Sequence, residues 1–149
     1  MPQSLSAIYI HIVFSTKDRH PFLADPELRA EAHRYIGGIC KGLGCIPIQI
    51  GGVADHVHIL TSLARTACPS ELVRKIKVSS NSWIRSEGVP RFAWQSGYGA
   101  FSVSRELLSV VENYVRSQEE HHKAWTFQEE FLRLLREHDL TWDDRYVWD

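Results

Sequence analysis

The fold of this chain is organised around residues 55–60, which read Asp55-His56-Val57-His58-Ile59-Leu60. Successive side chains of a β-strand point to opposite faces, so His56 and His58 share one face while Val57 and Ile59 point to the other, into a core. Two neutral imidazoles supply only part of a divalent metal site, and a further ligand must come from elsewhere. By spacing alone, hydrogen-bonded sheet histidines explain such a pair more often than a metal does.

The sequence around this stretch predicts alternating short strands and helices. Runs of β-branched and aromatic residues predict strands at 8–14, 46–50 and 56–63, with a turn at 51–55, and a further β segment at 92–94 and 98–103. Asp25 as N-cap and Pro26 after it predict a helix from 26 to about 42. Further helices are predicted over 70–85 and from 105 to about 122, with a short last helix after the Thr126 capping box. The helix at 105–122 is amphipathic and is expected to pack on the sheet.

Length and composition indicate one ordinary globular domain. The 149 residues are 44% hydrophobic and 11% aromatic, which suffices for a substantial core. Cys40, Cys45 and Cys68 are odd in number and form no C-x-x-C pair, which favours reduced structural thiols. There is no run of about 18 apolar residues and no secretory leader, so we expect a cytoplasmic protein without a membrane partner.

Charge is distributed unevenly along the chain, although the formal net charge is only -1. Residues 1–118 carry 13 basic and 9 acidic side chains, whereas residues 119–149 carry 4 and 9. A basic body with an acidic tail is compatible with a phosphate-bearing partner, and a solvated surface explains it equally simply. The aromatic residues at the end of the tail are expected to dock on the body or on a second subunit.

One predicted helix concentrates basic side chains among small polar residues. The helix at 70–85 carries Arg74, Lys75, Lys77 and Arg85. This mixture suits contacts to phosphate groups, and an ordinary solvated helix face accounts for it about as often. We therefore treat these four residues as candidate DNA-binding residues.

Tyr114 and Gln118 are four residues apart on the predicted helix at 105–122, so they share one face that can meet the histidine pair. A metal ion held by His56, His58 and the Gln118 amide oxygen could polarise a phosphodiester while Tyr114 attacks phosphorus. Oxygen and nitrogen ligands without cysteine favour Mg²⁺ or Mn²⁺ over structural zinc. The simpler interpretation is a tyrosine at the core edge beside a surface amide.

Three other histidines could face the same site. His11 interrupts the apolar run at 8–14, and a packed or hydrogen-bonded histidine without chemistry is the favoured interpretation. His121 and His122 follow Gln118 closely and could reach the site or DNA, although exposed histidines at a helix end are more common.

The combination of these motifs resembles the single-tyrosine HUH transposases of bacterial insertion sequences. The resemblance extends from Ile8 to about His122. It rests on the segments at 51–60, 70–85, 94–103 and 114–118, the last of which reads Tyr114-Val115-Arg116-Ser117-Gln118. The tail from Phe127 to Trp148 is similar to the subgroup known as REP-associated tyrosine transposases.

This resemblance implies an α/β (α+β) fold, with a ferredoxin-like, RRM-like antiparallel sheet, helices on one face and a C-terminal helical tail. It implies a catalytic domain over 1–125, to which residues 126–149 belong as a helix and acidic aromatic tail. It also implies a homodimer that cleaves and rejoins single-stranded DNA bearing a hairpin. By position, His56, His58 and Gln118 match the metal ligands and Tyr114 matches the nucleophile that takes a 5′ phosphate. In that family the tyrosine helix can complete the partner subunit's site.

Two other functions remain open at the level of sequence. A metal-dependent phosphoesterase would use bound water and leave Tyr114 as a packing residue. A domesticated, RRM-like protein would bind a single-stranded hairpin without cutting it. The intact set of His56, His58, Tyr114 and Gln118 favours the strand transferase over both.

Overall fold

The computed structural model describes residues 2–149, and at its centre lies a four-stranded antiparallel sheet. The strands are β1 (Tyr9–Ser15), β2 (Pro47–Val53), β3 (His56–Ser62) and β4 (Gly99–Val103). They lie in the order β2-β3-β1-β4, and each neighbouring pair is antiparallel. One helix joins β1 to β2 and another joins β3 to β4. This order confirms the ferredoxin-like fold that the resemblance implies.

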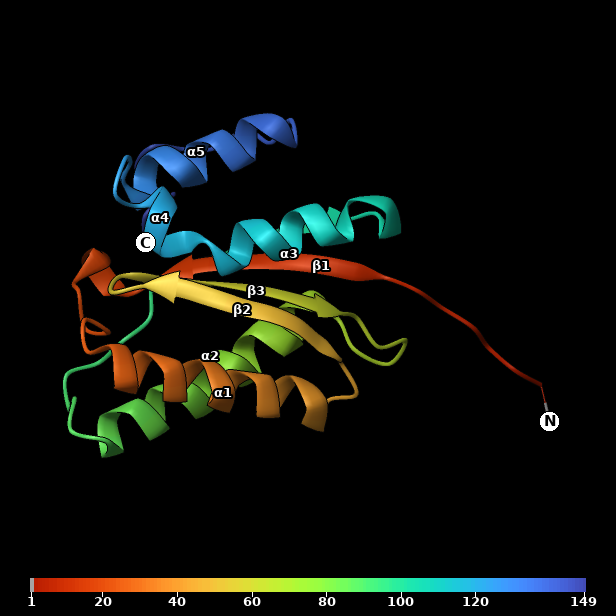
Figure 1. The fold of residues 1–149 in the computed structure, drawn as a ribbon, viewed down its shortest axis with the longest axis horizontal. Helices are drawn as coiled ribbons and strands as arrows, with labels where there is room; N and C mark the ends of the chain where they lie inside the picture. The colour runs from red at the N-terminus through yellow and green to blue at the C-terminus, as the bar shows by residue number, and fades with distance from the viewer. Residues whose placement is uncertain (1) are drawn as a thin grey trace.

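The two connecting helices cover one face of the sheet (Figure 1). They are α1 (Pro26–Gly42) and α2 (Pro69–Ser86). Asp25 caps α1 by accepting a hydrogen bond from the backbone N–H of Glu27, as the sequence predicts. Val57 and Ile59 of β3 are fully buried in the core on this side. The alternation of β3 therefore turns its histidines toward the opposite face.

The C-terminal part of the chain covers that opposite face (Figure 1). It comprises a 3-10 turn at Arg105–Leu107 and the helices α3 (Leu108–Arg116), α4 (Gln118–His121) and α5 (Phe127–Glu137). A second core forms here from Val13, Phe101 and the apolar side of α5, and Trp142, Val147 and Trp148 pack against it. The tail aromatics thus dock on the body of their own chain, which is one of the two predicted outcomes.

The single helix predicted over 105–122 is wrong, because the structure breaks it at Ser117. The Ser117 hydroxyl donates to the carbonyl oxygen of Asn113 at 2.8 Å, and its backbone N–H donates to the same oxygen at 3.1 Å. Such back-bonding by serine competes with the regular helical ladder. Tyr114 and Gln118 therefore lie on consecutive short helices, and not on one helix.

Two predicted β features also differ from the structure. The turn at 51–55 is shorter, because Gly51 and Gly52 belong to β2 and pair with His58 and Val57. The segment at 92–94 forms no strand and contributes only a bridge between Trp94 and Thr16. Trp94 is instead held by packing on aromatic rings and by a hydrogen bond of 2.9 Å to Ser80 Oγ.

Two further expectations concern the state of the cysteines and the presence of a membrane-spanning helix. Cys40, Cys45 and Cys68 are free thiols, as expected. Within residues 2–149, no helix is both long enough and apolar enough to cross a membrane.

Candidate functional site

Both histidines of β3 are fully buried, and their outer ring nitrogens are held by other side chains. His56 Nδ1 lies 2.7 Å from Asp55 Oδ1. His58 Nδ1 lies 2.8 Å from Nε2 of His11, which is itself buried on the neighbouring strand β1. A partner on one ring nitrogen fixes the ring orientation and directs the other nitrogen inward. His11 is therefore a hydrogen-bonded histidine, with His58 as its partner.

The inner nitrogens of the two rings converge on side chains from the C-terminal helices. His58 Nε2 lies 2.9 Å from Glu130 Oε1. His56 Nε2 lies 3.1 Å from Gln118 Oε1 and 3.4 Å from Glu130 Oε1. The Gln118 amide nitrogen donates to the Tyr114 carbonyl at 3.3 Å, which turns the amide oxygen toward His56. Glu130, on α5, thus lies against both histidines.

His122, in the connection between α4 and α5, is the third imidazole of the cluster. Its Nε2 lies 3.0 Å from Glu130 Oε1, and its Nδ1 donates to the Trp125 carbonyl at 2.9 Å. The rings of His122 and His56 are 4.3 Å apart. Of the two histidines that follow Gln118, His122 therefore reaches the site. His121 packs instead against the Tyr114 ring, at 4.8 Å.

Tyr114 reaches the same carboxylate from α3. Its hydroxyl donates a hydrogen bond to Glu130 Oε2, the oxygen that does not face the imidazoles. The Tyr114 ring lies edge-on to His58, with 5.7 Å between the ring centroids. The phenol and the histidine pair therefore meet within a single chain.

The charges of this buried cluster are strongly coupled. Although burial opposes its ionisation, hydrogen bonds from His122, His56 and His58 hold the pKa of the Glu130 carboxyl well below its ordinary value. Burial also opposes protonation of His56, but hydrogen bonds to Asp55 and Glu130 raise its pKa to about 9. Burial lowers the pKa of His58 to about 4. Burial and the negative charge of Glu130 raise the pKa of Tyr114 far above its ordinary range.

The cluster suits a divalent metal ion by the chemistry of its donors. His56, His58, His122 and Glu130 each offer one ligand atom, and these atoms all lie within 4.8 Å of one another. Imidazole nitrogens and carboxylate oxygens are ordinary ligands of divalent metals in proteins. Since the outer nitrogens of the two strand histidines already have partners, their inner nitrogens are the ones that would bind an ion.

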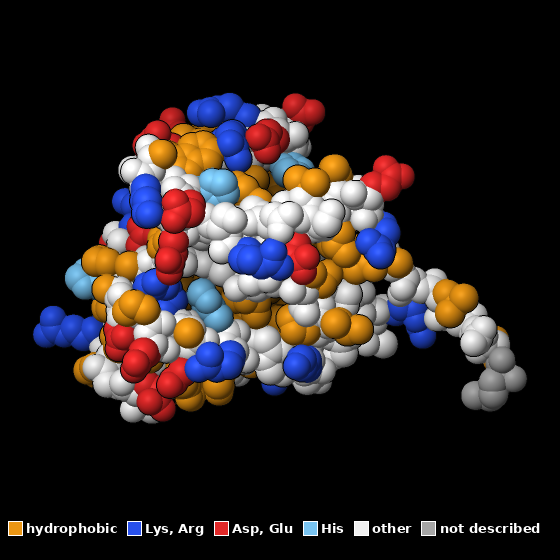
Figure 2. All heavy atoms as spheres, viewed as in Figure 1, with side chains coloured by type: hydrophobic (Ala, Val, Ile, Leu, Met, Phe, Trp, Pro, Cys, Tyr) orange, Lys and Arg blue, Asp and Glu red, His pale blue; other side chains and the backbone are white. Residues whose placement is uncertain are grey.

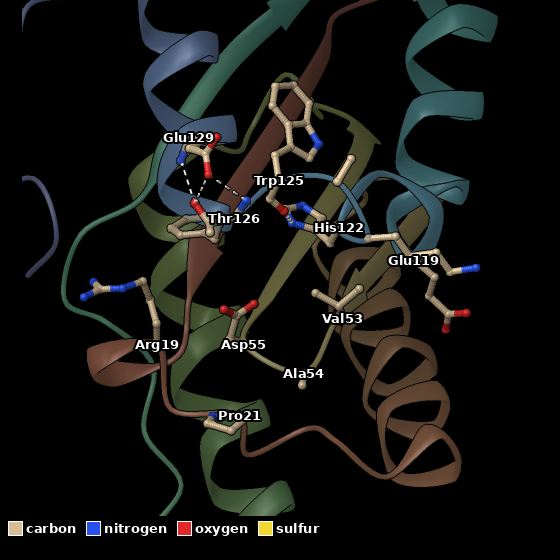
Figure 3. A pocket seen from close by; sticks show the side chains of 13 residues that line it. Arg19, Pro21, Val53, Ala54, Asp55, Glu119, His122, Trp125, Thr126 and Glu129 are labelled. Atoms are coloured by element: carbon tan, nitrogen blue, oxygen red, sulfur yellow. Dashed lines mark hydrogen bonds between the residues drawn. The ribbon is translucent and has the colours of Figure 1, made fainter.

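A cleft of about 730 Å³ opens beside the cluster. Its walls are the turn between β2 and β3, the segment joining α4 to α5, and the chain around Arg19. Figure 3 shows Asp55 and His122 pointing into this space from opposite sides. The cleft therefore connects the imidazole cluster with the outside.

The structure brings together the four residues that the sequence singled out for chemistry. His56, Gln118 and Glu130 are in direct contact, and Tyr114 joins them through Glu130. The sequence analysis did not single out Glu130. The sequence does contain a signal for Glu130, because this residue lies between Phe127 and Leu134 at helical spacing, on the apolar side of α5. A carboxylate on the buried face of a helix calls for polar or charged partners.

The candidate DNA-binding residues lie on α2, across the sheet from the imidazole cluster (Figure 1). Lys77 is engaged within the protein: its ammonium donates to the carbonyls of residues 95, 96 and 97 at 2.8, 3.1 and 2.6 Å. Arg85 donates to the Phe92 carbonyl at 2.8 Å, and Arg74 pairs with Glu71 at 2.9 Å. Lys75 is exposed. Their predicted role in DNA binding stays a prediction, and Lys77 has the least freedom to fulfil it.

One family model matches the sequence. It is described as transposase IS200 like, and it covers residues 4–118. The matched region includes His56, His58, Tyr114 and Gln118 and ends before His122 and Glu130. No curated protein matches the chain.

Two solved structures that share this fold are described as transposases. One is a candidate transposase from Deinococcus radiodurans R1, with 19% identity and a TM-score of 0.63 over 77% of this chain and 95% of that one. The other is a REP-associated tyrosine transposase bound to a REP hairpin, with 12% identity and a TM-score of 0.60 over 85% of this chain and 74% of that one. At these identities the likeness establishes the fold.

Proposed function

The chain belongs to the family of IS200-like transposases, and from that premise we propose that it cleaves and rejoins single-stranded DNA through a covalent bond to Tyr114. The observation that carries this proposal is the meeting of Tyr114, Glu130, His56 and His58 in one buried cluster of a single chain. A phenol beside several metal-ligating groups is the arrangement that nucleophilic attack on a phosphodiester requires.

We propose that His56, His58 and the amide oxygen of Gln118 hold a divalent ion, Mg²⁺ or Mn²⁺. Such an ion stabilises negative charge on the phosphate oxygens and on the attacking phenol oxygen. Asp55 and His11 support the proposal, since they orient the two imidazoles from behind.

Tyr114 is the proposed nucleophile. Its oxygen forms a bond to phosphorus while the bond from phosphorus to the 3′ oxygen breaks, which leaves a 5′-phosphotyrosine and a free 3′ hydroxyl. The phenolic proton passes along its hydrogen bond to Glu130 Oε2, and water in the open cleft supplies the proton that the departing 3′ oxygen takes up. One phosphoester replaces another, so the DNA can be rejoined by the reverse reaction without ATP.

The proposed substrate is single-stranded DNA that carries a hairpin. The fold is shared with a protein that was solved with a REP hairpin bound, and Arg74, Lys75, Lys77 and Arg85 remain the candidate contacts. On the face shown in Figure 2, basic and acidic side chains are interspersed over the described part of the chain. We therefore propose that the DNA strand reaches the cluster through the cleft beside it.

We also propose a homodimer, which the resemblance implies. Because Tyr114 meets Glu130 and the histidines within one chain, each subunit is proposed to use its own nucleophile. Light scattering of the purified protein measures the oligomeric state directly, and a monomer with full activity would reject this part of the proposal.

Replacing Tyr114 by phenylalanine tests the proposed nucleophile. Incubated with Mn²⁺ and a hairpin oligonucleotide drawn from the DNA flanking its coding region, the wild-type protein is expected to form a covalent adduct that survives denaturing electrophoresis. Tyr114→Phe is expected to lose both adduct and cleavage, because it lacks the attacking oxygen. Tyr98→Phe, which alters a tyrosine outside the cluster, serves as the control.

Two other outcomes would assign different functions. Cleavage that persists in Tyr114→Phe without an adduct would indicate a phosphoesterase that uses water. Hairpin binding with neither cleavage nor adduct in the wild type would indicate a non-cutting single-strand binder.

A further inference from the structure

We propose that Glu130 and His122, which lie beyond the region matched by the family model, are further ligands of the metal ion, so that three imidazole nitrogens and one carboxylate oxygen surround it together with the amide oxygen of Gln118. This inference rests on the proposed metal dependence of the enzyme. It assigns the C-terminal segment a direct part in the metal site.

The hydrogen-bond partners of His56 and His122 show which nitrogen of each ring is directed at an ion. His56 Nδ1 faces a carboxylate and His122 Nδ1 faces a carbonyl, both of which only accept hydrogen bonds, so each of these nitrogens carries a proton. The Nε2 atoms of both rings again face acceptors, Glu130 Oε1 in each case. Without an ion, each inner nitrogen meets this carboxylate by carrying a proton of its own, which a bound ion would displace. A cation between them satisfies nitrogen and oxygen together.

Glu130 is a buried carboxylate whose only ion-pair partners, within the described residues, are histidines. Its side chain is fully buried, and within residues 2–149 its ion pairs are with His56, His58 and His122 alone. A buried carboxylate without a lysine or arginine is costly unless it is paired with other positive charge or with a metal. All three pairs converge on one oxygen, Oε1, so the three Nε2 atoms surround a common point within reach of the carboxylate.

The second oxygen of Glu130 links this site to the nucleophile. Oε2 accepts the hydrogen bond from the Tyr114 hydroxyl while Oε1 faces the imidazoles. One carboxylate therefore fixes where the phenol oxygen lies relative to the ion. Gln118 Oε1, at 3.1 Å from His56 Nε2, is the uncharged oxygen ligand of the proposed set. Its removal is expected to weaken metal binding less than the removal of Glu130.

The donor set also bears on which metal is bound. Three imidazoles and a carboxylate suit Mn²⁺, Co²⁺ or Zn²⁺, whereas Mg²⁺ prefers oxygen ligands and retains most of its water. We therefore expect Mn²⁺ and Co²⁺ to bind much more tightly than Mg²⁺. Of the two ions proposed above, Mn²⁺ is therefore the expected one.

The test is metal binding by the full chain, measured by calorimetry with Mn²⁺, Co²⁺ and Mg²⁺ and by the visible spectrum of bound Co²⁺. Replacing a residue that merely supports a ligand typically costs about 10–100-fold in metal affinity. We expect Glu130→Gln and His122→Asn each to weaken Mn²⁺ and Co²⁺ binding by at least about 100-fold, and to alter the Co²⁺ spectrum. Glu120→Gln, at an exposed position on α4, is the matched control and should bind as the wild type does.

The outcomes separate this inference from the proposed function. Unchanged or tighter Mn²⁺ binding by Glu130→Gln and His122→Asn, with binding lost in His58→Ala, would overturn the inference alone. A wild-type protein that binds no divalent ion would overturn the proposed metal dependence as well. Circular dichroism checks the folding of each variant, and His122→Asn, at a half-buried position, carries the test if Glu130→Gln does not fold.

Discussion

At the scale of single residues, the two histidines of β3 are useful to the site because each has a second partner behind it. Asp55 holds His56 and His11 holds His58, at 2.7 and 2.8 Å. Both rings are buried, so neither can rotate freely toward solvent. Asp55 directly precedes His56 in sequence, whereas His11 comes from the neighbouring strand. A motif of two histidines therefore works here as a set of four residues.

His33 provides a pH prediction away from the metal cluster. Burial, and then the positive charge of Arg29, lower its pKa from 6.5 to about 4, and its Nε2 is buried without a hydrogen-bond partner. Because the folded state binds this proton more weakly than the unfolded state, its contribution to stability is present above pH 6.5. It is lost as the pH falls toward 4. The difference between these two pKa values corresponds to about 3 kcal/mol. The actual loss of stability is smaller, because the side chain is only half-buried and solvent screens its charge.

The measurement is urea unfolding of the wild type and of His33→Gln at several pH values from 4 to 7. The free energy of unfolding should fall less steeply with acid in His33→Gln. Other buried histidines contribute to both proteins, so the difference between the two curves isolates His33. Parallel curves would show that His33 titrates normally in the folded protein.

At the scale of elements, the site depends on how closely α3 lies on β2. A Cβ added at Gly51 would overlap the carbonyl oxygen of Val115, the residue after Tyr114. Residue 51 must therefore be glycine for α3 to lie this close to β2. The sequence predicts that Gly51 belongs to a turn, and this prediction is wrong because Gly51 pairs with His58 in the sheet. The height of Tyr114 above the sheet follows from this contact.

Gly51→Ala tests that contact. The new methyl group must push α3 away from β2, and we expect a loss of about 1–3 kcal/mol in the free energy of unfolding, as for other overpacked sites. We also expect less covalent adduct, because Tyr114 moves with α3. Gly38→Ala, on α1, is the control: its added Cβ has no neighbour within 4 Å. It should be neutral or slightly stabilising, since alanine favours helix. Equal stability of both variants would contradict the proposed packing role.

At the scale of the whole molecule, the site forms where the sheet meets three C-terminal elements. Its residues come from β3, α3, the start of α4, the connection to α5, and α5 itself. A ligand that joins such distant segments stabilises only the folded chain. Metal binding and global stability should therefore be linked.

This linkage predicts that Mn²⁺ raises the stability of the protein. At a free concentration of about 100 times its Kd, the ion is expected to add about 2.7 kcal/mol to the free energy of unfolding. Thermal unfolding followed with and without a chelator measures the shift, and His58→Ala should show none. A wild-type unfolding curve that Mn²⁺ leaves in place would argue against a site that spans these elements.

Local rules were sufficient for much of this protein. The period of two along β3 correctly placed Val57 and Ile59 in the core and the histidines on the other face. The capping residues Asp25 and Thr126 correctly marked the starts of α1 and α5. These features depend on hydrogen bonds and side-chain directions within a few residues, which a sequence displays directly. The family resemblance then supplied the fold, which the strand order confirms.

Only the tertiary structure decided what completes the cluster. His58 meets Glu130 across 72 positions of sequence, and no local pattern specifies that pairing. The break at Ser117, the capture of Lys77 by three carbonyls and the burial of Gly51 under α3 are likewise outcomes of packing between elements. The sequence by itself determined the strand, its two histidines and the nearby tyrosine. The packing of the C-terminal helices on the sheet determined which carboxylate faces them, because burial and long-range contacts exist only in the folded chain.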